Sequence, residues 1–352
     1  MAQETSWKAC SSVVAGELLN HGLDNTQQIV HHPNAMAMLP SIRASLHYED
    51  INLIPQLKPG VVLDAKVQNE MSRVIVPPME SIVGETFAVR ALQLGLSVCL
   101  PRFRSVDEQK QIFCAVKKQV SEDVFSRNLY VAVKVNDMKR VQALGHHKII
   151  VDDLNGYAAE AIQFARTLVE EGKSVITANV CTQEGILAYP VGADVRVGIG
   201  LGSTSNSAVF NGVTRGAVTS ILDCADRGEG RRIIADGGIK NPACAAKAFG
   251  LGANYVMMGY YFKRAFSAQN VLDQNYDYHG IESASQHFKT MGSIELPTEG
   301  YTIHYDKGDV CNIRTLVEDL CYGLSSAVNY SGFNTLHGFI GNGAFEINHP
   351  RE

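Results

Sequence analysis

The chain has 352 residues, of which 45% are hydrophobic and 19% are charged, and its formal net charge at pH 7 is −5. This composition is that of an ordinary globular protein with enough apolar material for a large core, and it argues against a disordered chain. Lysines and arginines are dispersed, and no basic stripe interleaved with aromatic residues occurs, so we expect no nucleic-acid partner.

The eight cysteines are scattered, without a Cys-x-x-Cys pair and without the spacing of metal ligands. The chain shows neither the apolar core of a secretory signal nor an apolar run of membrane-spanning length. We therefore predict a cytoplasmic protein with reduced thiols, no metal centre and no membrane partner.

Residues 1–45 are largely polar, with one weakly helical stretch, and they carry no recognisable chemistry. We predict an N-terminal extension over residues 1–45 and a single domain over residues 46–352. That domain is expected to include a flap at about residues 270–310 and a C-terminal helix.

Short runs rich in β-branched residues alternate with amphipathic segments from residue 73 onward. We predict a strand in each of eight runs: 73–78, 96–101, 129–135, 148–153, 174–180, 195–200, 231–238 and 253–259. Segments 84–95, 156–172 and 241–252 show helical spacing of apolar residues and end in glycine, as helices often do.

Strand followed by helix, eight times, predicts an α/β fold, the (β/α)8 TIM barrel. The competing fold is a doubly wound parallel sheet. The chain has no G-x-G-x-x-G that opens a helix and no G-x-x-x-x-G-K-[ST], so we favour the barrel.

Turns with glycine follow the sixth, seventh and eighth predicted strands. They contain Ser203, Asp236, Gly237, Gly238, Met258, Gly259 and Tyr260. Glycine lets backbone N–H groups approach phosphate oxygens closely, and a helix expected to begin near Pro242 directs its positive end toward the same place. Asp236 stands where it would accept both hydroxyls of a ribose. Tight turns alone would explain each glycine, but their combination predicts a site for a nucleoside monophosphate.

Other predicted strands also end in residues that a barrel would bring to the same face. These are Met79, Glu80, Asp152, Asn155 and Asn179. Each Asp or Asn would serve equally as the cap of the next helix. Only the barrel prediction makes them converge on one site.

Several motifs occur in a fixed order over about residues 47–335, among them "PPMES", "VDDLNGY", "ANVCT", "GADVRVGIGLGS", "ADGGIKNP" and "EGYTIHYDKGDV". Their order and spacing resemble the IMP dehydrogenase and GMP reductase superfamily. No extra module of roughly 120 residues interrupts the early strands, as it does in most IMP dehydrogenases. The stretches "NGY", "DCAD" and "KAFGLGA" also look closer to GMP reductases.

The resemblance implies an enzyme that binds a purine nucleoside 5′-monophosphate, either GMP or a modified purine nucleotide. It would use NADPH, or alternatively NADH, to reduce the base with loss of ammonia. The implied substrate-binding residues are Met79, Asn179, Ser203, Asp236, Gly237, Gly238, Met258, Gly259 and Tyr260. The implied cofactor-binding residues are Asp152, Asn155 and Gly156. The resemblance also implies a homotetramer and a monovalent cation at the Gly200–Gly202 loop.

The chain departs from the family at the nucleophile. The family pattern is G-S-x-C-T-T-R, whose cysteine attacks purine C2, and Ser205 stands at the position of that cysteine. The family's catalytic threonine falls on Ser207 and its partner glutamate on Glu299. A serine hydroxyl needs an adjacent base to become a nucleophile, and no histidine lies in this segment, so we predict a non-covalent role for Ser205.

Two other functions remain open. The first is a diverged nucleotide-binding paralogue without covalent catalysis, because the cysteine is lost while the phosphate turns are kept. The second is an IMP dehydrogenase, which is less well supported because its reaction depends on the same missing thiol. Asn206 and Ala208 also depart from the pattern, so we favour natural divergence over an engineered Cys-to-Ser change.

Overall fold

The structure is a computed structural model. It describes residues 44–58, 64–153, 155–205, 207–225, 230–279 and 302–348. The chain divides into two compact units, Met1–Ser45 and Leu46–Glu352. Nearly all of the predicted N-terminal extension, and residues 280–301 of the predicted flap, lie outside the described residues.

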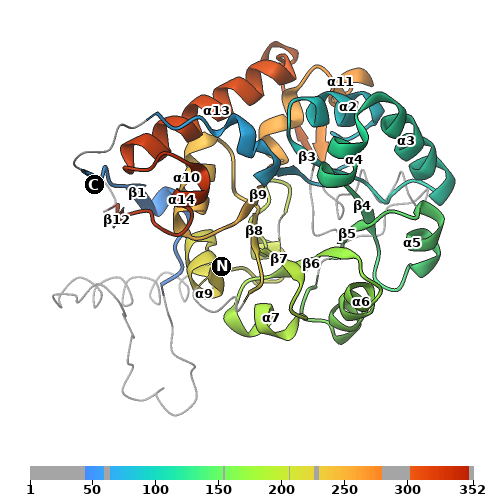
Figure 1. The fold of residues 1–352 in the computed structure, drawn as a ribbon, viewed down its shortest axis with the longest axis horizontal. Helices are drawn as coiled ribbons and strands as arrows, with labels where there is room; N and C mark the ends of the chain where they lie inside the picture. Colours follow the sequence, from blue (N-terminus) through green and yellow to red (C-terminus); the bar gives the residue numbers. More distant parts are fainter. Residues whose placement is uncertain are drawn as a thin grey trace, which may run out of the picture. The chain divides into compact units, whose positions relative to one another are not determined.

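Eight parallel strands close into a barrel within the second unit. They are β2 (Val74–Val76), β3 (Ser97–Leu100), β4 (Leu129–Val133), β5 (Lys148–Val151), β6 (Ser174–Val180), β7 (Ala193–Val197), β8 (Ile233–Asp236) and β9 (Tyr255–Met257). β9 pairs with β2, with Val256 opposite Val74, and this pairing closes the ring at the centre of Figure 1. Each predicted strand is present, so the (β/α)8 barrel is confirmed and the doubly wound sheet is excluded.

Helices surround the ring (Figure 1). They are α2 (Glu85–Gln93), α3 (Val106–Gln119), α4 (Glu122–Asn128), α5 (Met138–Leu144), α6 (Ala159–Glu170), α7 (Gln183–Ala188), α9 (Ala217–Ala225), α10 (Pro242–Leu251) and α13 (Ile313–Tyr330). Their ends follow ordinary capping chemistry: the Asn241 side chain accepts a hydrogen bond from Cys244 N, Pro242 follows it, and Gly252 ends α10 in the left-handed region.

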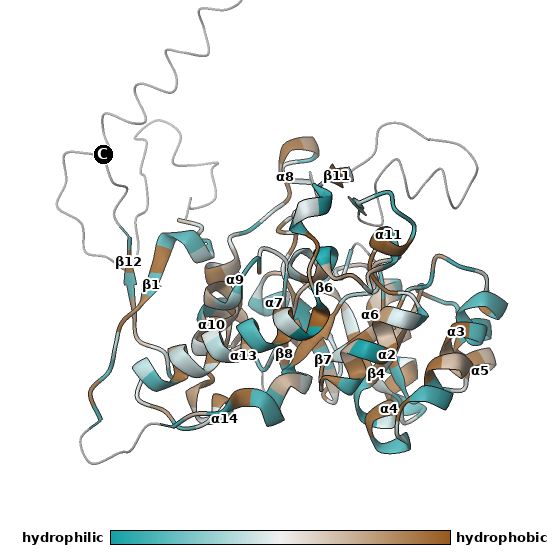
Figure 2. Cartoon of the chain, turned by 90° about the horizontal axis from the view of Figure 1, so that it is seen from above, coloured by the Kyte–Doolittle hydropathy of each residue, from teal (hydrophilic) through white to brown (hydrophobic). Residues whose placement is uncertain are grey.

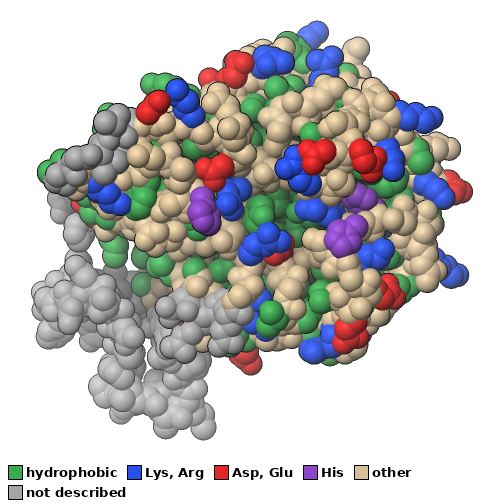
Figure 3. Space-filling view, viewed as in Figure 1, with side chains coloured by type: hydrophobic (Ala, Val, Ile, Leu, Met, Phe, Trp, Pro, Cys, Tyr) green, Lys and Arg blue, Asp and Glu red, His purple; other side chains and the backbone are tan. Residues whose placement is uncertain are grey.

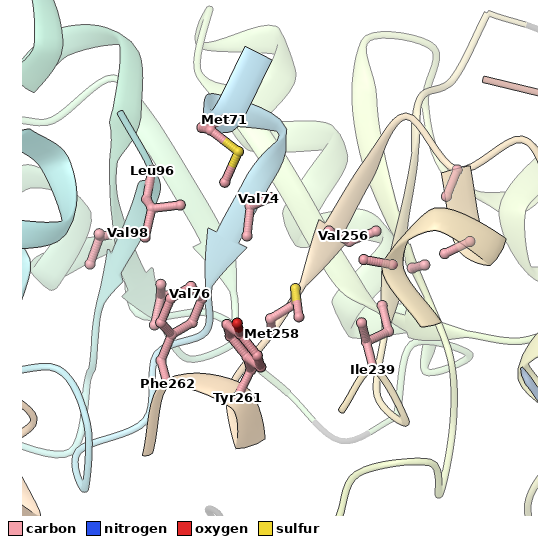
Figure 4. Packing of buried hydrophobic residues seen from close by; sticks show 14 of the residues in the cluster. Met71, Val74, Val76, Leu96, Val98, Ile239, Val256, Met258, Tyr261 and Phe262 are labelled. Carbon is pink, nitrogen blue, oxygen red and sulfur yellow. The ribbon is translucent and has the colours of Figure 1, made fainter. Parts of the chain in front are cut away.

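The core has two shells. One shell packs between the outer face of the barrel and the helices, and Figure 4 shows part of it around Val74, Val76 and Val256. The other fills the barrel itself with Ile75, Cys99, Tyr130, Ala132, Ile150, Ile176, Ile234 and Met257. Because both faces of these parallel strands are buried, they appear in the sequence as continuous apolar runs.

The two ends of the unit are joined by a small sheet. β1 (Ile51–Leu53) pairs antiparallel with β12 (Phe345–Ile347), with Ile51 opposite Ile347. The predicted C-terminal helix is α13, which packs against α10.

A second small sheet lies on the side where the barrel strands end. β10 (Asp277–His279) pairs antiparallel with β11 (Thr302–His304), with Tyr278 opposite Ile303. Figure 2 shows β11 on the same side of the barrel as α8 (Ser207–Phe210) and α11 (Gln269–Leu272). This arrangement sets additional side chains above the ends of the strands.

The surface charges are mixed. On the face seen in Figure 3, Lys and Arg side chains are scattered among Asp and Glu and do not gather into one stripe. Among the described residues, no helix combines the length and the hydropathy that crossing a bilayer requires.

We predict that Gly216→Ala destabilises the barrel unit. A Cβ at this position would lie 2.2 Å from the Leu46 carbonyl oxygen. That oxygen accepts a hydrogen bond from Val218 N, which connects the start of the unit to α9. The backbone must shift to admit the methyl group, so we expect a loss of about 1–3 kcal/mol in the free energy of unfolding. Urea denaturation measures it.

Gly308→Ala is the matched control, because a Cβ at Gly308 would meet no atom within 4 Å. Its unfolding free energy should stay close to that of the wild type. Equal stability of Gly216→Ala and Gly308→Ala would contradict this account of the close approach.

Candidate active site

A cavity of about 820 Å³ opens where the barrel strands end. Its volume lies in the range of sites that bind small molecules. The loops after β2, β5, β7, β8 and β9, together with the end of β6, contribute predicted site residues. Those that line it are Met79, Asp152, Asn155, Asn179, Ser203, Ser205, Ser207, Asp236, Gly237, Gly238, Gly259 and Tyr260. Sequence positions spread over most of the chain therefore meet at one place, as the barrel predicts.

Arg196, a residue that was not predicted from the sequence, is a buried cation in the described cavity wall. It comes from β7, is 4% exposed, and donates through Nε to the Thr177 carbonyl at 2.9 Å. Its guanidinium lies 3.5 Å from Asp152 Oδ1 and 3.7 Å from Asp236 Oδ2. One buried cation therefore holds two carboxylates that belong to the ends of different strands. A single arginine inside a buried apolar run was the available signal, because a charge in such a strand must be paired.

Asp236 at the end of β8 is fixed by two neighbours. Asn179 Nδ2 donates to Asp236 Oδ2 at 2.9 Å and to the Gly198 carbonyl at 2.8 Å. Burial raises the pKa of the Asp236 carboxyl, and the Arg196 charge and the Asn179 hydrogen bond oppose that rise. The pairing of β6 with β7 shifts register just before Asn179, and such irregularities often direct a side chain toward a site.

Asp152 after β5 has a second cation beside it. Arg102 Nε donates to the Asp152 carbonyl oxygen at 3.0 Å and to Oδ2 at 3.1 Å. Asp152 is 6% exposed. Its Oδ2 lies beside the Arg102 guanidinium and its Oδ1 beside the Arg196 guanidinium. Arg102 was also missed, since a polar residue in a loop gives no sequence signal of its partner.

The loops after β7 and β8 pack on each other through glycine. Gly198 has φ +143°, and a Cβ there would lie 2.0 Å from the Asp236 carbonyl oxygen. Gly237 has φ +94°, and its Cβ would lie 2.8 Å from Leu201 Cβ. Any side chain at either position would separate the two loops, so these glycines set the shape of the cavity wall.

The turn after β9 is crowded in the same way. A Cβ on Gly259 would lie 2.8 Å from both Met79 Sδ and the Tyr278 hydroxyl. Tyr260 follows it, and its ring meets the Tyr278 ring edge to face at 5.9 Å. Tyr278 belongs to β10 and was not selected from the sequence, although it lines the cavity.

Comparison with known proteins agrees with this geometry. The family model described as the IMP dehydrogenase / GMP reductase domain matches residues 45–348. The chain belongs to this family.

The relatives include enzymes of both names. GMP reductase from Enterobacter sp. (strain 638) is 35% identical over 205 residues, which is 53% of this chain and 57% of that protein. GMP reductase from Caenorhabditis elegans is 32% identical over 249 residues, 65% of this chain and 67% of that protein. Inosine-5′-monophosphate dehydrogenase from Streptococcus pyogenes is 34% identical over 224 residues, 60% of this chain and 44% of that protein. The chain thus spans little more than half the length of the first of these relatives. The GMP reductases among them confirm the predicted closeness to that group.

The Ser205 hydroxyl belongs to a local hydrogen-bond network. Ser205 Oγ donates to Ser207 Oγ at 3.2 Å, and Ser207 N donates to Ser205 Oγ at 3.4 Å. Within the described part of the chain, no histidine or carboxylate forms a hydrogen bond with the Ser205 hydroxyl. Glu299, the predicted partner of Ser207, lies outside the described residues.

Two predicted site residues lie behind the cavity wall. Met258 is fully buried and packs beside Tyr261 in the outer core (Figure 4). Gly156 N donates to the Asn179 carbonyl at 3.1 Å, and a Cβ on Gly156 would lie 2.3 Å from that oxygen. Neither lines the cavity, so the structure gives Met258 a packing role and Gly156 a role in supporting Asn179.

The described residues contain no cluster of three or more His, Cys, Asp or Glu side chains suited to a metal ion. The Gly200–Gly202 loop is held by Thr214 Oγ1, which donates to the Ile199 carbonyl at 2.9 Å.

We predict that Arg196→Met is strongly destabilising in a pH-dependent way. Removing one partner of a buried ion pair costs about 3–5 kcal/mol, because the remaining charge stays buried. Without the guanidinium, the pKa of Asp236, already raised by burial, rises further above its unfolded value. The loss should therefore be full above that folded pKa and shrink as the pH falls through it.

Urea unfolding at slightly alkaline and at acidic pH measures this effect. Arg127→Met is the matched control, since Arg127 pairs with Asp123 on the exposed surface, where ion pairs contribute little. A loss for Arg196→Met that is independent of pH would contradict the proposed charge balance.

Proposed function

We propose that the chain is a GMP reductase-like enzyme that acts on a purine nucleoside 5′-monophosphate, GMP or a modified purine nucleotide. The hydride would come from NADPH to purine C2, the C2–N bond would break, and the amine would leave as ammonia after protonation. The observation that carries the proposal is that glycine turns after β7, β8 and β9 meet at one cavity with Asp236. Membership of an oxidoreductase family supports it.

The phosphate would bind at the three turns. Ser203, Gly238 and Gly259 line one cavity, and at Gly259 the crowding by Met79 and Tyr278 leaves no room for a side chain. The N-terminus of α10 follows the Gly237–Gly238 turn closely and favours an anion there. Asp236, oriented by Asn179, would accept hydrogen bonds from the ribose hydroxyls.

We assign the rest of the cavity to a nicotinamide. Phe103 and Tyr157 offer aromatic faces, and Asn155 and Thr182 offer amide and hydroxyl groups. Tyr157 is fixed by its hydroxyl, which lies 2.8 Å from Thr182 Oγ1. When bound, NADPH supplies the hydride. The residues proposed to orient it are Asp152 and Asn155, with Gly156 acting behind them.

Proton transfer is assigned to Ser207 and Glu299 on the family resemblance. A homotetramer and a monovalent cation at the Gly200–Gly202 loop belong to the same proposal and rest on that resemblance alone. NADH is the alternative reductant.

The direct test is loss of NADPH absorbance with GMP and a panel of modified purine monophosphates. We expect turnover with at least one monophosphate and none with the matching nucleoside. Failure of every monophosphate both to bind and to oxidise NADPH would refute the proposal. Formation of XMP from IMP and NAD would instead indicate an IMP dehydrogenase.

A second candidate function is nucleotide binding without covalent catalysis, in a diverged paralogue. It is favoured by the Ser205 hydroxyl, whose described hydrogen bonds are to Ser207 and not to a base. Calorimetry that shows nucleotide binding in a protein without turnover would support it over the reductase.

We predict opposite effects for two substitutions of Ser205. Ser205→Cys introduces a thiol that is partly ionised near neutral pH, so GMP reductase activity should appear or rise. Ser205→Ala removes one polar contact, which corresponds to about 1–3 kcal/mol in the barrier, or roughly a 5- to 150-fold fall in kcat/KM.

Intact-mass analysis of a quenched wild-type reaction tests whether the Ser205 hydroxyl itself attacks the base. A nucleotide adduct mapped to Ser205, together with complete loss of turnover in Ser205→Ala, would show that the serine is itself the nucleophile. The predicted non-covalent role requires that no adduct form.

A further inference from the structure

The cavity wall is acidic, although its proposed ligand is an anion. Its described lining contains five carboxylates, Glu80, Asp152, Asp153, Glu184 and Asp236. Arg196 is the single Lys or Arg side chain in that lining, and it is already shared by Asp152 and Asp236. A phosphate group would add further negative charge. A positive potential at the glycine turns proposed to bind phosphate therefore needs a cation close behind the cavity wall.

Lys263 is such a cation. It lies in η3 (Tyr260–Arg264), immediately beyond the Gly259 turn, and is 7% exposed. Its Nζ lies 3.9 Å from the centroid of the Tyr260 ring, and Tyr260 lines the cavity. The ammonium is thus about one aromatic ring away from the turn that would bind phosphate.

Three tyrosines form the surroundings of this ammonium. Besides Tyr260, the Tyr305 and Tyr278 rings have their centroids 5.1 Å and 5.8 Å from Nζ. The Tyr305 hydroxyl also donates to the Lys263 carbonyl and accepts a hydrogen bond from Asn270 Nδ2 at 2.7 Å. These contacts come from η3, β10 and the segment after β11, so the position of the lysine is fixed by three separate parts of the chain.

The three tyrosine rings surround the Lys263 ammonium but do not neutralise its charge. Within the described ranges, no carboxylate lies within ion-pair distance of Lys263 Nζ. A cation–π contact holds the ammonium in place but brings no negative charge to it. An anion bound on the cavity side of Tyr260 would therefore experience the positive potential of Lys263.

We propose that Lys263 is a positioning residue that makes the phosphate end of the cavity selective for nucleoside monophosphates over nucleosides. It acts through the Tyr260 ring and the local potential, without touching the ligand. This inference rests on the proposed function and adds to it the residue that recognises the phosphate charge.

The test compares GMP with guanosine, which lacks the phosphate, by titration calorimetry. Lys263→Met keeps the length of the side chain and removes the charge. Its affinity for GMP should fall by about 10- to 100-fold, the effect of one nearby charge at the effective dielectric of a protein. Its affinity for guanosine should stay within about twofold of the wild type, because a neutral ligand does not sense the charge.

Two control variants separate charge from packing. Lys263→Arg keeps the charge and should restore most of the GMP affinity. Lys307→Met removes one positive charge from the exposed surface and should leave GMP binding unchanged. If Lys263→Met does not fold, Lys263→Gln provides the same comparison.

The outcomes distinguish this inference from the proposed function. If the wild type binds GMP and Lys263→Met binds it equally well, the inference is overturned while the proposed function stands. Equal losses for GMP and guanosine would show that the lysine only supports the tyrosines. A wild type that binds no purine monophosphate overturns both.

Discussion

The ion-pair arrangement around Arg196 is the constraint on which the cavity depends. Asp152 and Asp236 lie at the ends of two different strands, and the buried Arg196 guanidinium lies near both carboxylates and offsets their negative charge. Arg196 itself is oriented by the Thr177 carbonyl, an element of the barrel backbone. The barrel strands therefore position the two carboxylates, and the hydrogen bond from Asn179 fixes the Asp236 side chain.

Close backbone contacts hold the loops after β7 and β8 together. Gly198 and Gly237 let the loops after β7 and β8 pack directly, and Gly259 lies between Met79 and Tyr278. A cavity built in this way has walls of backbone and short side chains on one side and acidic groups elsewhere. Under the proposed function, recognition of a phosphate would depend on oriented N–H groups and on positive charge behind the wall, and the proposal gives α10 and Lys263 related roles.

The proposed divergence of the chain within its family has a physical explanation. The proposed phosphate and ribose sites depend on backbone shape, and their sequences resemble the family motifs. The proposed nucleophile position depends on one side chain, that of Ser205, which shares hydrogen bonds with Ser207. A fold can keep the first kind of feature while the second changes, because the barrel scaffold is independent of the chemistry at the tips of its loops.

The sequence by itself determined the eight strands and their order, and most of the site residues that it predicted line the cavity, because strand runs, glycine turns and family motifs are local patterns. It could not reveal which groups Arg196, Arg102 and Lys263 contact. Each acquires its role from partners far away in the chain, across the ring or across the β10–β11 sheet. Local pattern also predicts Met258 at the site, and only the structure shows that its side chain packs in the outer core. Tertiary structure alone decided which charges meet, since pairing in a buried interior depends on distance in space.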